Sequence, residues 1–220
     1  MSSLYDKNAS GYDAQRRKVL PCFDEFYHIL EHSMLVSQDT PQILELGCGT
    51  GILTERIVKK FPNAVIHVID QSQKMLEIAR EKLRDNRRII FQQSDFMSCI
   101  FETNYDLIVS SLAIHHLSHY DKVRVYQKCF NHLNHGGSFI NGDKFRSSNI
   151  HSENHIQALW TAEIVQNELK HKELEELNER KKNDKPATVL QNLRWLKRAG
   201  FAHADLIYKY LYLGIVYAVK

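Results

Sequence analysis

The most informative part of the sequence reads Ile43-Leu44-Glu45-Leu46-Gly47-Cys48-Gly49-Thr50-Gly51, and Val68-Ile69-Asp70 follows it. This order predicts an apolar strand, a glycine-rich turn that opens a helix, and a second strand that ends on an acid. Glycines permit the positive φ angles of a tight turn and let a ligand approach the main chain closely. An acid about twenty residues after such a turn is placed to accept hydrogen bonds from ribose hydroxyls. The stretch therefore predicts a βαβ unit that binds an adenosine-containing cofactor.

The spacing of the glycines favours a cationic cofactor over a dinucleotide. A dinucleotide fingerprint reads G-x-G-x-x-G and sets a helix N-terminus against a pyrophosphate, whereas this turn reads G-x-G-x-G. Glu45 stands two residues before the first glycine, where a carboxylate attracts a cation and repels an anion. S-adenosylmethionine (SAM) carries a positive sulfonium and a positive ammonium. At these residues the chain resembles the class I SAM-dependent methyltransferases, whose first motif reads E/D-x-G-x-G-x-G.

Apolar segments alternate with helical patterns from residue 42 to residue 143. The expected strands are 42–46, 65–69, 89–91, 107–109 and 138–141, and the expected helices are 52–60, one capped by Ser72, and 120–133. Strands with continuous apolar character are typical of a parallel sheet covered on both faces. The resemblance implies an α/β, Rossmann-like class I methyltransferase fold, with a mostly parallel seven-stranded sheet, helices on both faces and a helical lid.

A length of 220 residues predicts a single domain, which we divide into four parts. They are an N-terminal helical cap (1–38) with a helix from about 21 to 36, a SAM-binding core (42–143), a helical insertion or lid (149–183), and a C-terminal helix and hairpin (186–220). We expect the cap and the insertion to cover the ligand-binding edge of the sheet and to exclude water there. The alternative is that they only extend the hydrophobic core.

The resemblance implies a set of cofactor contacts. Main-chain groups of the glycine turn would hold the methionine part of SAM, Asp70 the ribose, and residues after the second and third strands the adenine. The expected cofactor-binding residues are Glu45, Gly47, Cys48, Gly49, Gly51, Asp70, Gln71, Met75, Asp95, Phe96, Ser111 and Phe23.

Two neighbouring histidines are the candidate catalytic residues. His115 and His116 follow the fourth strand, between the expected cofactor and the acceptor, and an imidazole that titrates near neutral pH is suited to general base catalysis. The alternative is that they cap or pack the sheet edge. This region lacks the N/D/S-P-P-Y/F motif of enzymes that methylate amino groups of DNA bases. Methyl transfer from a sulfonium depends chiefly on alignment of the nucleophile, so a base is required only where the acceptor must lose a proton.

The whole chain resembles a methyltransferase subgroup that includes carboxy-SAM synthase. The residues that carry this resemblance are Leu46-Gly47-Cys48, Ile69-Asp70-Gln71-Ser72, Leu133-Asn134-His135-Gly136-Gly137, Asp143-Lys144-Phe145 and Ala199-Gly200-Phe201-Ala202-His203. In that family a tyrosine, an asparagine and an arginine hold a carboxylated cofactor, and Phe23, Ser111 and Arg180 are the counterparts here. Gly49 stands where the synthase has serine. These differences favour an ordinary methyltransferase that shares the synthase's architecture and its tendency to form homodimers.

The net charge, the cysteine spacing and the lack of long apolar runs narrow the classes of function that we expect. The net charge of +3 does not demand nucleic acid, and the basic run at 179–182 follows acids, so we expect a solvated helix face there. The four cysteines form no C-x-x-C pair, which favours reduced thiols in a cytoplasmic protein and no metal site. The stretch from Met1 to Asp6 lacks the basic and apolar regions of a signal peptide, and no apolar run reaches membrane-spanning length, so we expect neither a signal peptide nor a membrane span. We therefore expect a SAM-dependent methyltransferase that releases S-adenosylhomocysteine and acts on a small molecule. A carboxy-SAM synthase or tRNA-modification enzyme, and a noncatalytic SAM-binding module, are the alternatives.

Overall fold

The computed structural model describes residues 11–167, 169 and 171–220. The first ten residues of the expected N-terminal cap lie outside this part. The helices are α2 (Tyr12–Val19), α3 (Phe23–His32), α4 (Ile52–Lys60), α5 (Gln73–Lys82), the short 3₁₀ helix η1 (Ile114–His116), α6 (His119–His132), α7 (Ile150–Gln166), α8 (His171–Lys181) and α9 (Val189–Ala199). The strands are β1 (Gln42–Leu46), β2 (Val65–Asp70), β3 (Ile89–Gln93), β4 (Tyr105–Ser111), β5 (Leu133–Lys144), β6 (His203–Tyr210) and β7 (Leu213–Val219).

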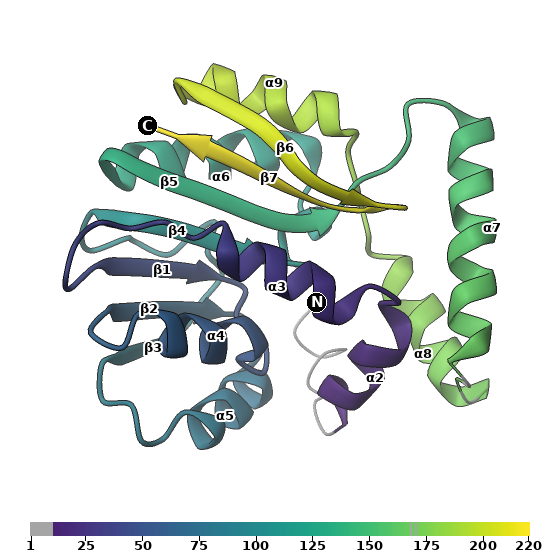
Figure 1. Cartoon of the computed structure of the whole chain (residues 1–220), viewed down its shortest axis with the longest axis horizontal. Helices are drawn as coiled ribbons and strands as arrows, with labels where there is room; N and C mark the ends of the chain where they lie inside the picture. The colour runs from purple at the N-terminus through teal and green to yellow at the C-terminus, as the bar shows by residue number, and fades with distance from the viewer. Residues whose placement is uncertain (1–10, 168, 170) are drawn as a thin grey trace.

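The strands form one seven-stranded sheet in the order β3-β2-β1-β4-β5-β7-β6 (Figure 1). The first five are parallel, and β7 runs antiparallel between β5 and β6. Leu46 at the end of β1 pairs with Ile69 of β2 and with Ser110 of β4. This register brings the glycine turn, Asp70 and Ser111 to one edge of the sheet, as the sequence predicts.

Two apolar layers cover the two faces of the sheet. Alternate residues of the central strands, such as Ile43 and Leu44, belong to different layers because successive side chains of a strand point to opposite faces. The first layer packs α3, α4 and α5 against the sheet, and the second packs α6 and α9. Strands β1 and β4 are buried almost throughout, which explains their continuous apolar sequences.

Several boundaries confirm the sequence-based predictions. Ser72 caps α5 by accepting a hydrogen bond from the Met75 amide, at 3.2 Å. Helix α9 starts with a capping box at Thr188 and ends at Gly200, whose φ of 110° is left-handed. The expected C-terminal hairpin forms from β6 and β7.

Other elements differ from expectation. Strand β5 starts at Leu133, directly after α6, rather than at Ser138, because Leu133 already pairs with Tyr105 and Asn134 donates a 2.7 Å hydrogen bond to Asp106. The insertion forms two helices, α7 and α8. Within residues 11–38, the described part of the N-terminal region, two helices form, α2 and a shorter α3, where a single helix was expected. In Figure 1, α2, α8 and α7 lie beyond the carboxyl ends of β1 and β5. None of the described helices is long and apolar enough to cross a membrane.

Candidate functional site

The glycine turn after β1 depends on two positions that reject a side chain for different reasons. Gly47 has a φ of 73°, and a Cβ there would lie 2.4 Å from Cβ of Ala113. Gly49 has a φ of 54°, and a Cβ there would meet nothing within 4 Å. The first glycine lets the turn pack against the start of η1. The second presents bare main chain to open space, which is the surface that a ligand needs for close approach.

Asp70 at the end of β2 holds this turn in place. Its Oδ2 accepts a hydrogen bond from the Gly49 amide at 2.8 Å, and its Oδ1 accepts one from the Ser72 amide at 2.8 Å. The Gly47 amide donates to the Ile69 carbonyl at 2.8 Å. The acid and the turn are therefore one rigid unit before any ligand binds.

A cleft that is partly open to solvent lies over this unit. Its walls come from the glycine turn, the ends of β2 and β4, η1 and the N-terminal helices α2 and α3. Ten of the residues expected at the site line it: Glu45, Gly47, Cys48, Gly49, Asp70, Gln71, Met75, Phe96, Ser111 and His116. The cleft thus forms where the sequence places the cofactor.

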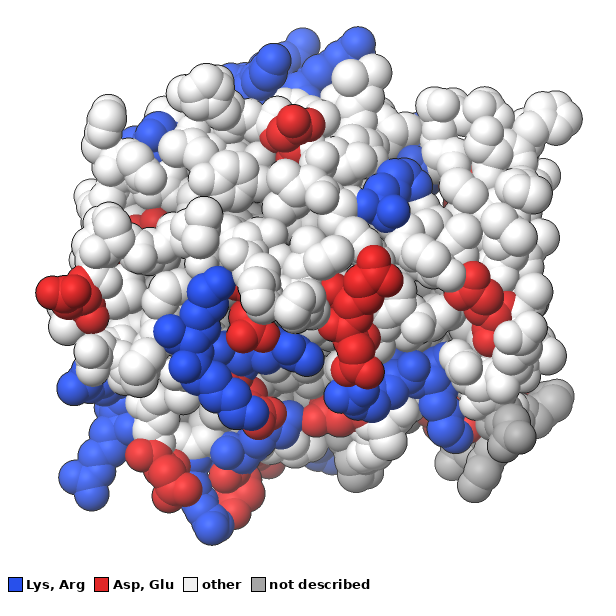
Figure 2. Space-filling model, in the orientation of Figure 1, with Lys and Arg blue, Asp and Glu red and all other residues white. Residues whose placement is uncertain are grey.

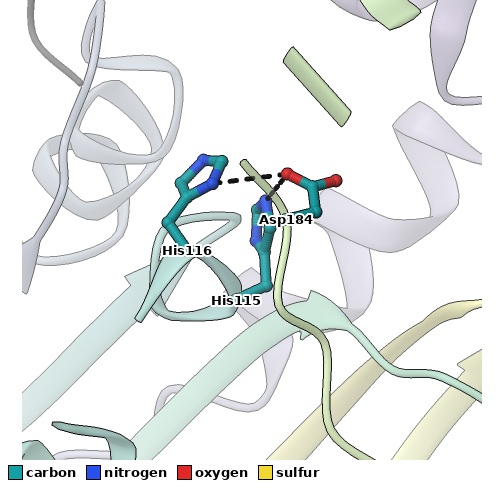
Figure 3. A group of neighbouring side chains, drawn as sticks. All are labelled: His115, His116 and Asp184. Carbon is teal, nitrogen blue, oxygen red and sulfur yellow. Dashed lines mark ion pairs between the residues drawn. The ribbon is translucent and has the colours of Figure 1, made fainter. Parts of the chain in front are cut away.

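The two histidines of η1 occupy different positions. His116 lines the cleft, whereas His115 is buried behind it. His115 Nδ1 lies 2.5 Å from Oδ1 of Asp143 on β5. On its other side, His115 Nε2 lies 3.3 Å from Oδ1 of Asp184, and His116 Nδ1 lies 3.3 Å from the same oxygen (Figure 3). Burial, followed by the neighbouring His115, lowers the pKa of His116 to about 3. Its ring is therefore neutral near pH 7 and is only a weak general base.

Comparisons with known proteins agree with this geometry. Residues 43–137 match the family model described as a methyltransferase domain. Malonyl-[acyl-carrier protein] O-methyltransferase 1 of Ilyobacter polytropus is 39% identical over 95 residues, which are 43% of this chain and 35% of that protein. An uncharacterized methyltransferase of Bacillus cytotoxicus is 33% identical over 139 residues, which are 63% of this chain and 61% of that protein. The chain thus spans less than two thirds of the length of either relative.

Solved structures share the fold at low sequence identity. Haemonchus contortus phosphoethanolamine N-methyltransferase 2, in complex with S-adenosyl-L-methionine, superposes with a TM-score of 0.67 at 15% identity, covering 90% of this chain and 52% of that one. Human N-acetylserotonin methyltransferase in complex with SAM gives a TM-score of 0.64 at 16% identity, covering 96% of this chain and 57% of that one.

Over residues 43–137 the chain is thus similar to a methyltransferase domain. Both of these solved structures contain SAM, which is the cofactor that the glycine turn and Asp70 of this chain predict. The sheet order and the helices on both faces are those of a class I methyltransferase fold.

Four of the expected site residues lie outside the cleft. His115 is one, and Gly51 is another, because it caps α4 and faces Ala79. Asp95 accepts a 2.8 Å hydrogen bond from the Met97 amide and so stabilises its own turn. Phe23 is buried among apolar residues of α3. Tyr27, one helical turn later, lines the cleft in its place, and Ser111 Oγ donates to Tyr27 Oη at 3.2 Å.

Glu45 is the buried acid of the cleft. Its side chain accepts a 2.6 Å hydrogen bond from Thr54 Oγ1 at Oε2. Burial, reinforced by the charge of Asp70 and opposed by the Thr54 hydrogen bond, raises the pKa of Glu45 to about 8. The carboxyl is therefore largely protonated at neutral pH, and a cation bound beside it would favour the charged form.

Helix α2 brings two residues to the cleft that the sequence analysis did not identify, Tyr12 and Arg16. This helix lacks an apolar stripe, and its buried residues include Gln15 and Arg16. Arg180 of α8 is also buried and donates a 2.6 Å hydrogen bond from Nη2 to Gln15 Oε1. The basic run at 179–182 is thus not entirely a solvated face, because Arg180 points inward and holds α2 against α8.

The insertion borders a second cavity rather than the cofactor cleft. Arg16 lines both spaces. The other walls of the second cavity include Lys144, Arg146, Trp160, Leu177, Lys181, Asp184 and Tyr212. The cap and the insertion therefore border different spaces. Helices α2 and α3 border the cofactor cleft, whereas α7 and α8 border the second cavity beside it.

Proposed function

We propose that the protein transfers the methyl group of SAM to a small-molecule acceptor. This proposal rests on the hydrogen bond from the Gly49 amide to Asp70, which lies at the base of a cleft next to the buried acid Glu45. The bare main chain of the turn would hold the methionine part of SAM, and Asp70 would hold the ribose. Glu45 would become ionised beside the positive charges of the cofactor.

Tyr27, Ser111 and His116 also line the cleft, and beside these side chains an acceptor would meet the methyl group. Transfer is an in-line displacement, in which the acceptor atom forms a bond to the methyl carbon as the bond from carbon to sulfur breaks. The sulfonium becomes a neutral thioether, so a dry pocket favours the reaction. Since His116 is a weak base, alignment is the main contribution that we assign to these residues.

Surface charge supports a small acceptor rather than a nucleic acid. Figure 2 shows lysines and arginines interspersed with aspartates and glutamates over one face, without a continuous basic band. Binding of a nucleic acid backbone requires clustered positive charge and is lost steeply as salt rises.

The test is turnover of SAM to S-adenosylhomocysteine with a panel of acceptors, followed by mass spectrometry. The panel would include carboxylates and carrier-bound acyl groups, because one relative is a malonyl-[acyl-carrier protein] O-methyltransferase. We expect acceptor-dependent product with at least one class. Tight SAM binding without turnover on any acceptor would support the noncatalytic module instead.

A carboxy-SAM synthase-like activity is the second candidate. One observation favours it: Tyr27 lines the cleft and contacts Ser111, so a tyrosine is present near the expected modified methyl group although Phe23 is not. Arg180 does not line the cleft, and Arg16 is the arginine that does. A prephenate-dependent gain of one carboxyl group on the cofactor would identify this activity.

The homodimer and the cytoplasmic location stay predictions. Sedimentation of the purified protein at several concentrations would determine its oligomeric state.

A further inference from the structure

Three potential metal ligands converge beside the cofactor cleft. They are His115 Nε2, His116 Nδ1 and Asp184 Oδ1, and these atoms all lie within 4.8 Å of one another (Figure 3). The histidines follow β4, and Asp184 lies in the segment between α8 and α9. Their side chains are only 1%, 12% and 11% exposed, respectively.

The hydrogen bonds of His115 direct its second nitrogen at the acid. Asp143 lies 2.5 Å from Nδ1 of His115, so Nδ1 carries the proton and donates it to that carboxylate. In the neutral ring Nε2 then presents a lone pair toward Asp184 Oδ1, only 3.3 Å away, whereas a ring protonated on both nitrogens would donate to both carboxylates. Two acceptors at this distance repel each other unless a cation or an additional proton lies between them.

Hydrogen bonds to main-chain carbonyls fix the three ligands relative to one another. The Lys185 amide, next to Asp184, donates a 2.8 Å hydrogen bond to the His115 carbonyl. The ammonium of Lys122 is buried and donates to the Lys185 carbonyl at 2.7 Å and also to the Leu117 carbonyl. The segment that carries Asp184 is thereby fastened to η1 although it is almost seventy residues away in sequence. A site assembled this firmly needs little rearrangement to bind an ion.

We propose that His115, His116 and Asp184 bind a divalent transition-metal ion, with Zn²⁺ as the best match. Two imidazoles and one carboxylate are a ligand set that zinc accepts, with a further coordination position left open. Asp143 would be the outer carboxylate that orients a metal-binding histidine. The spacing of the cysteines predicts no metal site, and no local motif joins the two histidines to Asp184, which lies almost seventy residues further along the chain.

The location gives the ion a role in the reaction. His116 lines the cofactor cleft and Asp184 lines the second cavity, so an ion between them would face both spaces. An acceptor oxygen bound to the open position would be oriented toward the cleft. Lys144 Nζ lies 2.6 Å from Asp184 Oδ2 and leaves Oδ1 to the ion, but its positive charge opposes binding. We therefore expect measurable but not extreme affinity.

The experiment is calorimetric titration of Zn²⁺ into chelator-treated, full-length protein, with Co²⁺ absorption as a second readout. We expect one equivalent to bind, with the visible bands of Co²⁺ in a low-coordinate nitrogen and oxygen site. Asp184→Asn and His116→Asn should each weaken binding by about tenfold or more, and Asp143→Asn by about 10–100-fold. The matched control is His155→Gln on α7, an exposed histidine whose loss should leave binding unchanged.

The Lys144→Met variant distinguishes a metal site from a cluster in which a shared proton bridges the histidines and Asp184. Removal of the lysine charge should tighten Zn²⁺ binding, because Asp184 Oδ1 stays in place while the repulsion disappears. Circular dichroism would first establish that each variant is folded. Absence of a one-equivalent event in the wild type, or equal binding by wild type and by folded Asp184→Asn and His116→Asn, would overturn the proposal and leave a shared proton as the bridge. SAM affinity of the same metal-free preparation is measured separately, so failure here is distinct from failure of the proposed methyl transfer.

Discussion

Asp70 Oδ2 accepts a hydrogen bond from the amide of Gly49 across 2.8 Å, and this contact joins the end of β2 to the glycine turn after β1. The other oxygen of the same carboxylate binds the Ser72 amide at the start of α5. One acid therefore fixes the turn, the next helix and one wall of the cleft. Because a carboxylate oxygen can accept more than one hydrogen bond, Asp70 is suited to bind ribose hydroxyls as well.

Replacement of Asp70 should weaken SAM binding. In Asp70→Asn, one oxygen that would accept a ribose hydroxyl becomes an NH₂ donor and the negative charge is lost, so we expect a loss of about 1–3 kcal/mol in SAM binding free energy, the scale of hydrogen bonds to a charged group. Calorimetry measures this directly. Asp205→Asn is the control, since Asp205 is exposed on β6 and lies outside the cleft. Unchanged SAM affinity in Asp70→Asn would remove Asp70 from the cofactor site.

Gly49→Ala should abolish or strongly weaken SAM binding, because the new methyl group projects into space that the ligand needs. The matched control is Gly136→Ala, which has a φ of 76°, equally open surroundings and no place in the cleft. Both variants should lose about 1–2 kcal/mol of stability from left-handed strain. Only Gly49→Ala should lose SAM affinity, by tenfold or more in a calorimetric titration. Equal SAM affinities in the two variants would contradict the placement of the cofactor.

The sequence predicts the local features of the site but not the features that depend on contacts between distant elements. The glycine turn, Asp70 and the Ser72 cap are local features, because spacing and residue type determine them. The place of helix α2 depends on distant contacts instead. Its buried residues include polar Gln15 and Arg16, and Gln15 has its partner on α8. An apolar stripe in the sequence therefore does not reveal which face of α2 is buried.

The direction in which a side chain points is also not predictable from the local sequence. A family register places Phe23 at the cofactor, yet α3 turns Tyr27 into the cleft, and only the crossing of α3 over the sheet determines which residue faces inward. Asp184 likewise joins the histidines through the path of a connecting segment, which no local pattern announces. The sequence thus predicts many of the residues that line the cleft around the glycine turn, and it misses those that α2, α3 and the connecting segment at Asp184 bring there or beside it.

The raised pKa of Glu45 should make stability depend on pH. Its pKa is about 8 in the folded protein and about 4.3 in an unfolded chain. The folded state therefore binds more protons between these values, and this group's contribution to stability falls as pH rises through that window. Urea denaturation across the window should show a smaller fall in Glu45→Gln than in the wild type. Identical pH profiles would show that Glu45 is not the titrating group.

SAM binding should release a proton from Glu45. The positive cofactor favours the carboxylate, so binding near neutral pH should expel a proton from the wild type and none from Glu45→Gln. Calorimetry in two buffers of different ionisation enthalpy measures the number of protons released. Equal proton release by the two proteins would contradict contact between Glu45 and the cationic part of SAM.

The contact between Arg180 and Gln15 should govern closure of α2 over the cleft. Arg180→Met removes a 2.6 Å hydrogen bond to Gln15 Oε1, and loss of a charged buried donor costs about 1.5–3 kcal/mol. We expect faster hydrogen exchange over residues 12–19 and faster SAM dissociation. Lys182→Met, at an exposed position just past α8, is the control. Unchanged exchange in α2 would show that other contacts hold the helix closed.

The central claim is that the turn at Gly47–Gly49, held by Asp70, forms a SAM site. Titration calorimetry of the wild-type protein with SAM tests it most directly. The account predicts saturable binding at one SAM per chain, with S-adenosylhomocysteine competing for the same site. Absence of saturable binding to folded protein would contradict it.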